Sequence, residues 1–117
     1  MAKKILLVED EKNLRTLYQE RLSEEGYEIV PAGNGEEALR KLKKAKPDLV
    51  LMDIVMPGLD GIQLLSMIRA NDRAIPVIFH SAHLNFQLEP KIQAANCFVR
   101  KTSDLKELKE KIQELLS

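Results

Sequence analysis

Three acidic side chains directly follow short apolar segments of the chain. Glu9 and Asp10 come after the apolar run 5–8, and Asp53 comes after the run 49–52. If these two runs are neighbouring parallel strands, their carboxyl ends share one edge of a sheet, so the three carboxylates lie close together. Like charges at short range raise one another's pKa or recruit a cation, and oxygen ligands without His or Cys select a hard ion such as Mg²⁺. The spacing therefore predicts a site for a hard divalent cation.

A hydroxyl and an ammonium follow two further apolar runs. Ser81 comes after the run 77–79, and Lys101 comes after the run 97–99. Beside a metal-bound carboxylate these groups form a receptor for phosphate oxygens, which predicts phosphoryl transfer to a carboxylate. Asp53 is then the nucleophile that becomes an acyl phosphate, Lys101 holds a phosphoryl oxygen or pairs with Asp53, and Ser81 donates a hydrogen bond. Each residue alone is explained as an ordinary turn or surface residue, so only their convergence at one edge indicates a site.

The elements that must position these residues alternate along the chain. Short apolar runs are separated by stretches in which apolar residues recur at helical spacing, and continuous short runs are typical of strands covered on both faces. This order predicts a three-layer α/β domain with a parallel sheet and five strand–helix units. The runs lie at 5–8, 28–32, 49–52, 77–79 and 97–99.

Helix boundaries are marked by residues that favour caps and stops. Gly26 is the expected C-terminal stop of the first helix. Asn34 and Glu37 have the spacing of a capping box at the start of the second helix. Further helices are predicted over 62–68, over 90–95, where a proline suits the first turn, and over 105–115.

A proline inside the second predicted strand sets the strand order. Pro31 lacks a backbone donor, and proline in a sheet is tolerated mainly at an edge. An edge position for the strand 28–32 fits the flavodoxin-like order 2-1-3-4-5, with strands numbered along the chain. In that order the strands 5–8 and 49–52 are neighbours, which is the condition for the acidic cluster.

The composition indicates one domain without a general affinity for nucleic acid or membrane. The chain has 117 residues, with 18 Lys and Arg against 18 Asp and Glu, so its net charge is zero. A single cysteine, Cys97, excludes an internal disulfide and fits a reducing compartment. The apolar runs of the chain are too short for a membrane helix or a signal peptide. We therefore expect a single domain over 1–117 in the cytoplasm, with no direct binding to nucleic acid or membrane.

Two segments carry a resemblance to a known family. The segments 4–11 (KILLVEDE) and 48–61 (DLVLMDIVMPGLDG) resemble the opening strand and the phosphoacceptor strand of the receiver domain of two-component response regulators, and 34–39 and 76–82 also match. The resemblance covers the whole chain, and its central motif is highly specific. It implies a phosphoacceptor signalling domain that catalyses only its own phosphoryl transfer and dephosphorylation.

The resemblance implies a phosphoacceptor and a metal site. Asp53 would accept phosphate from a sensor histidine kinase or a phosphotransfer protein. Mg²⁺ would be bound by four ligands, which are the side chains of Glu9, Asp10 and Asp53 and the backbone carbonyl of Val55.

It also implies a switch. Ser81 and Lys101 match the family's hydroxyl and lysine positions, and Phe98 matches its switch aromatic, although it can equally be a core residue. Phosphorylation would then change the face around the expected helix 90–95, the strand 97–99 and the last helix. That face would contact a downstream protein target.

The sequence departs from the family pattern at three places. Thr102 stands where a proline usually follows the lysine, and a non-proline cis bond costs about 3 kcal/mol, so this peptide is either strained or differently shaped. The stretch from Ser81 to Lys101 is slightly short, with Asn96 near its end where a small turn residue is common, and Ser81 replaces the more frequent threonine.

His80 and His83 are most simply structural residues, since no third metal ligand accompanies them.

Other functions use similar elements. A small phosphohydrolase of the haloacid-dehalogenase kind is the main alternative, but Val55 stands where that class carries its second Asp. A flavodoxin-like cofactor site is disfavoured because the segment 9–12 is acidic instead of phosphate-cradling. A receiver without phosphorylation chemistry is disfavoured because the acids and Lys101 are present. A stand-alone regulator acting by protein contact is the simplest interpretation, and a piece of a larger regulator remains an alternative.

Overall fold

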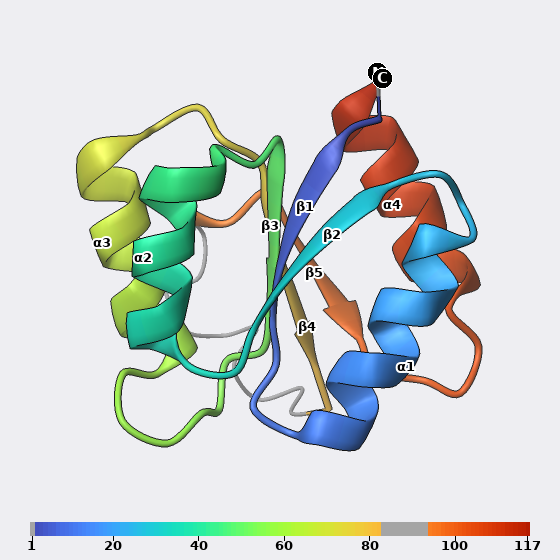
Figure 1. Ribbon diagram of the computed structural model, residues 1–117, viewed down its shortest axis with the longest axis horizontal. Helices are drawn as coiled ribbons and strands as arrows, with labels where there is room; N and C mark the ends of the chain where they lie inside the picture. Colours follow the sequence, from blue (N-terminus) through green and yellow to red (C-terminus); the bar gives the residue numbers. More distant parts are fainter. Residues whose placement is uncertain (1, 83–93) are drawn as a thin grey trace.

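Five parallel strands form one sheet in the computed structural model, which describes residues 2–82 and 94–117 (Figure 1). Their order is β2-β1-β3-β4-β5, as predicted, with β2 at one edge. Pro31 lies in this edge strand and pairs in register with Leu7. The strands are β1 (Lys4–Val8), β2 (Glu28–Ala32), β3 (Leu49–Met52), β4 (Val77–Ser81) and β5 (Cys97–Arg100).

Four helices cover the sheet in the described part of the chain. Figure 1 shows α2 and α3 on one face and α1 and α4 on the other, which confirms the three-layer flavodoxin-like architecture. The helix predicted over 90–95 lies mainly outside the described residues. The four helices are α1 (Lys12–Ser23), α2 (Gly35–Ala45), α3 (Gly61–Asn71) and α4 (Lys106–Leu116).

The sheet is buried on both faces because each central strand divides its side chains between two cores. Along β1, Leu6 and Val8 belong to the core under α2 and α3, while Ile5 and Leu7 belong to the core under α1 and α4. This alternation follows from the two-residue period of a strand. A strand that is apolar on both faces reads as a continuous run, which is why the sequence pattern identified it.

The predicted stop and caps are present, with one change of partner. Gly26 has a φ of +94° just beyond the end of α1. The Asn34 side chain accepts a hydrogen bond from the Glu37 N–H at 2.8 Å. The Glu37 carboxylate, however, accepts from the Gly33 N–H at 2.6 Å, so the reciprocal half of the predicted capping box goes to the end of β2. A complete capping box joins Asp60 to the third residue of α3.

Asn96 ties the start of β5 to its neighbours. Its side-chain oxygen accepts hydrogen bonds from the Val77 N–H at 2.9 Å and from Arg69 Nη2 at 3.0 Å. The Asn96 N–H donates to the Val77 carbonyl at 2.8 Å. The asparagine that departs from the family pattern therefore anchors β5 to β4 and α3.

Gly61 allows α3 to begin against the end of β3. A Cβ at this position would lie 2.3 Å from the Asp53 carbonyl oxygen and 2.7 Å from Ile54 Cα. The Gly61 N–H donates to the Ile54 carbonyl at 2.8 Å. Because both neighbours are backbone atoms, the first turn of α3 and the segment that carries Asp53 fit together only with glycine here.

We expect Gly61→Ala to lower the free energy of unfolding by about 3 kcal/mol, since backbone must move to admit the methyl group. Gly26→Ala is the matched control, because a Cβ there meets nothing within 4 Å and only the positive φ is strained. That strain costs about 1 kcal/mol. Urea unfolding of the two variants measures both values, and equal losses would contradict the close approach at Gly61.

Candidate functional site

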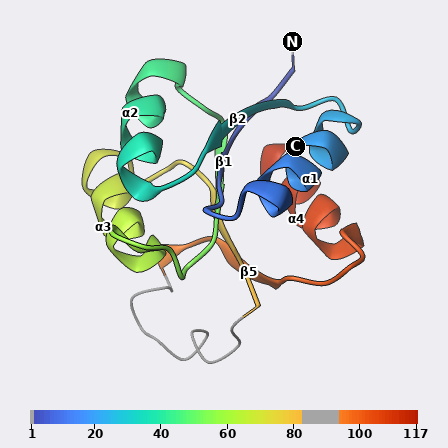
Figure 2. The same ribbon diagram turned by 60° about the horizontal axis from the view of Figure 1, so that its bottom comes forward.

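The carboxyl ends of β1 and β3 bring the three predicted carboxylates together. Glu9, Asp10 and Asp53 each offer an oxygen, and these oxygens all lie within 4.8 Å of one another. Figure 2 turns this edge of the sheet toward the viewer. The juxtaposition follows from the parallel pairing of β1 with β3, which ends at Val8 and Met52, directly before the acidic residues.

Lys101 lies between two of these carboxylates. Its Nζ is 2.6 Å from Glu9 Oε1 and 2.7 Å from Asp53 Oδ2. The side chain reaches them because the Lys101 N–H donates to the Ser81 carbonyl at 2.9 Å, which extends the β5 pairing by one residue. The peptide bond before Thr102 is trans, so of the two predicted alternatives the link is differently shaped and is not a strained cis bond. Lys101 still reaches both carboxylates.

In both Glu9 and Asp53, the carboxylate oxygen that does not face Lys101 accepts hydrogen bonds from the backbone. Asp53 Oδ1 accepts from the Ile54 N–H at 2.7 Å and from the Val55 N–H at 3.3 Å. Glu9 Oε2 accepts from the Glu11 N–H at 3.1 Å. Each carboxylate therefore has one oxygen on the backbone and the other on the Lys101 ammonium, which fixes its orientation.

Burial and pairing act against each other at this edge. Glu9 is 3% exposed, and its burial raises the pKa of the carboxyl above its usual range although the Lys101 hydrogen bond opposes the shift. Burial of Lys101 favours the neutral amine, but hydrogen bonds to Asp53 and Glu9 outweigh burial and raise the pKa of the ammonium. Lys101 is therefore a cation at neutral pH, and it compensates part of the negative charge.

The donor set fits a hard divalent cation. All three acidic side chains offer oxygen atoms, which are the ligands that Mg²⁺ prefers. Asp10 is exposed and Asp53 retains 9% of its surface, so the cluster is open on the solvent side. Val55, the source of the predicted carbonyl ligand, is 46% exposed and lies beside Asp53 on the same loop.

The other two predicted site residues lie on β4 and β5. Ser81 is 0% exposed at the end of β4, and its register partner is Arg100 on β5. Phe98 is half-buried, pairs in register with Phe79 and packs against the core under α2 and α3. The phosphoryl contact of Ser81 and the switch role of Phe98 stay predictions.

Sequence reasoning missed Arg15, whereas its structural interpretation of His80 agrees with the structure. Arg15 Nη1 donates to the carbonyl of Glu9 at 2.7 Å, a contact that no motif signals. His80 is 3% exposed, and its ring centroid lies 5.0 Å from that of Tyr18 on α1. The histidine is a core residue, as expected, while His83 lies outside the described residues.

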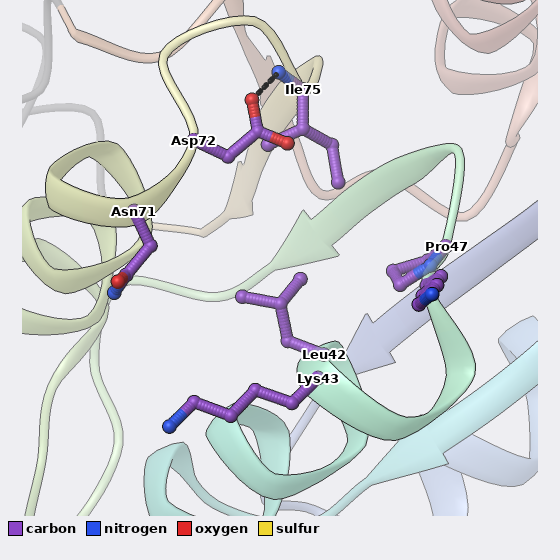
Figure 3. A pocket seen from close by; sticks show the side chains of 7 residues that line it. Leu42, Lys43, Pro47, Asn71, Asp72 and Ile75 are labelled. Carbon is purple, nitrogen blue, oxygen red and sulfur yellow. Dashed lines mark hydrogen bonds between the residues drawn. The ribbon is translucent and has the colours of Figure 1, made fainter.

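A pocket at the opposite edge of the sheet is unrelated to the acidic cluster. Figure 3 shows it between the C-terminal ends of α2 and α3, with Leu42, Pro47 and Ile75 among its lining residues. Pro47 and Ile75 precede β3 and β4, whereas the carboxylates follow the strands. The pocket contains no predicted site residue.

Comparisons with known proteins agree with this geometry. Residues 5–113 match the response regulator receiver domain family. Sporulation initiation phosphotransferase F of Bacillus subtilis is 36% identical over 118 residues, which cover 99% of this chain and 95% of that protein. The transcriptional regulatory protein PhoP of the same organism is 42% identical over 82 residues, and these span only 34% of its length. The matches thus span 95% of the length of the first relative and about a third of the length of the second.

Solved structures similar to this chain are also response regulators. The response regulator TrrA of Thermotoga maritima, in complex with Mg²⁺ and BeF, superposes with a TM-score of 0.95 and 43% identity over 97% of this chain and 99% of that chain. TrrA in complex with the histidine kinase ThkA superposes with a TM-score of 0.92. The chain therefore belongs to the response regulator receiver domain family, which decides against the phosphohydrolase alternative. No helix in the described residues is long and apolar enough to span a membrane.

We expect His80 to make stability depend on pH. Burial, aided by the Lys101 charge, lowers the pKa of His80 from its usual 6.5 to about 4. As the pH falls between these values, the unfolded chain takes up a proton that the folded protein does not, so the free energy of unfolding falls. Relative to His80→Phe, which keeps a ring against Tyr18, the wild type should lose about 3 kcal/mol between pH 7 and pH 4 in urea unfolding.

The carboxyl groups are common to both proteins, so their titration cancels in the difference. A stability difference that stays constant from pH 7 to pH 4 would show that the folded protein protonates His80 normally.

Proposed function

We propose that Asp53 is the phosphoacceptor of this receiver domain. The observation that supports this most strongly is the Lys101 ammonium, which lies 2.7 Å from Asp53 Oδ2. The backbone donors on Asp53 Oδ1 leave Oδ2 directed toward the ammonium. This oxygen is therefore the nucleophile, and Lys101 is placed to hold an oxygen of the incoming phosphoryl group.

The proposed reaction transfers a phosphoryl group from the donor to the carboxylate of Asp53. The Asp53 oxygen attacks phosphorus, the new O–P bond forms while the bond to the donor group breaks, and the electron pair of that bond leaves with the donor. Lys101 moves from the free carboxylates to the phosphoryl oxygens, and the Ser81 hydroxyl donates to another of these oxygens. The acyl phosphate keeps the Oδ1 contacts with the backbone.

We assign the metal ligands to Glu9, Asp10, Asp53 and the backbone carbonyl of Val55. Support comes from the chemistry of the oxygen cluster and from the relative TrrA, whose structure contains Mg²⁺ and BeF. When bound, Mg²⁺ supplies positive charge that neutralises the transferring group.

The donor we propose is a sensor histidine kinase or a phosphotransfer protein. TrrA, which is similar to this chain, forms a complex with the kinase ThkA. The half-buried Phe98 is the proposed switch aromatic. The responding face includes β5, α4 and the segment 90–95, most of which lies outside the described residues. This face would contact a downstream protein, so the unit 1–117 acts as one cytoplasmic signalling domain, not as an enzyme on other substrates.

Incubation with Mg²⁺ and acetyl phosphate tests the phosphoacceptor. We expect the intact mass of the wild type to rise by one phosphoryl group, and Asp53→Asn to show no gain because an amide is not a nucleophile for this reaction. Asp104→Asn is the matched control. Asp104 is exposed and caps the Lys106 N–H through Oδ1, a role that asparagine also fills.

The control variant should gain the same mass as the wild type. An equal gain in Asp53→Asn would refute the assignment of Asp53.

A further inference from the structure

Arg15 extends from the first turns of α1 back to the acidic loop. Its Nη1 donates to the Glu9 carbonyl at 2.7 Å and lies 3.4 Å from the Asp10 carbonyl. The Arg15 N–H donates to the Glu11 carbonyl at 2.9 Å, so the same residue is also tied to the start of the helix. One side chain thus contacts the main chain of both acidic residues that follow β1.

Gly33, directly after β2, packs against this guanidinium. A Cβ at Gly33 would lie 3.2 Å from Arg15 Nη1, so glycine leaves the room that the side chain occupies. The Gly33 N–H is held by the Glu37 carboxylate at 2.6 Å, and the Glu9 N–H donates to the Ala32 carbonyl at 3.0 Å. The Arg15 side chain is therefore confined between the acidic loop and a fixed strand end.

The charge of Arg15 and its position have opposite effects on a metal ion. In the described part of the chain, no carboxylate lies within ion-pair distance of Arg15, and its hydrogen bonds go to carbonyl oxygens. A nearby positive charge by itself repels a divalent cation. Fixing the backbone that carries two ligands, in contrast, lowers the cost of assembling them around the ion. The sign of the effect on affinity thus distinguishes the two roles.

We propose that Arg15 is a positioning residue for the divalent cation site: it fixes the backbone of Glu9 and Asp10 so that their carboxylates face Asp53. The inference rests on the proposed metal site and adds a residue that is not one of the proposed ligands. Removing a group that orients metal ligands costs on the order of tenfold in metal affinity.

Calorimetric titration of the full chain with MgCl₂ tests this directly. Arg15→Met keeps much of the aliphatic stem but removes the donors, and we expect Mg²⁺ to bind roughly tenfold more weakly. Arg40→Met is the control, because it removes the same charge from an exposed position on α2. We expect the control to bind Mg²⁺ as the wild type does.

Gly33→Ala supplies a second test that changes no charge. The added methyl group would displace the guanidinium, and the φ of Gly33 is outside the left-handed region, so alanine fits the backbone. We expect weaker Mg²⁺ binding in this variant also. Urea unfolding confirms that each variant is folded at the titration temperature.

Unchanged or tighter Mg²⁺ binding in Arg15→Met would overturn the inference. Asp10→Asn separates this failure from failure of the proposed metal site, since it alters a proposed ligand. If Asp10→Asn weakens binding and Arg15→Met does not, only the role of Arg15 is wrong. If Asp10→Asn binds Mg²⁺ like the wild type, the proposed metal site itself is wrong.

Discussion

The Lys101 ammonium between the carboxylates of Glu9 and Asp53 is the interaction on which this edge of the domain depends. Two carboxylates that are almost fully buried repel each other, and neither has enough water around it to stabilise its charge. Contacts of 2.6 and 2.7 Å to one cation offset that repulsion. The same cation faces the oxygen that we propose to accept phosphate, so in the proposed reaction the group that stabilises the resting site would also hold the phosphoryl group.

The topology makes this contact possible. Strands β1 and β3 are neighbours in the sheet, and β5 reaches the same edge through β4. Parallel strands place all their carboxyl ends on one side, so residues more than ninety positions apart in sequence meet there. Gly61 then lets α3 start against the backbone of Asp53, and Arg15 connects α1 to the backbone of Glu9.

Most of this arrangement was predictable from patterns with a short range. Buried strands such as 49–52 read as apolar runs, and Pro31 marked an edge strand. The acidic residues directly after the runs 5–8 and 49–52 do lie together at the carboxyl edge. Contacts between distant backbone atoms left no such pattern. The bond from Arg15 to a carbonyl, the transfer of the Glu37 bond to Gly33 and the anchoring role of Asn96 depend on how the folded elements approach one another.

We propose that the ends of β1, β3 and β5 form one cation-binding unit, and amide chemical shifts followed during a Mg²⁺ titration are the decisive measurement. We expect the amides of Glu9, Asp10, Asp53 and Lys101 to shift together and to fit one dissociation constant, while the amides of residues lining the pocket of Figure 3 stay unchanged. Shifts confined to that pocket, or different dissociation constants at the three strand ends, would contradict it.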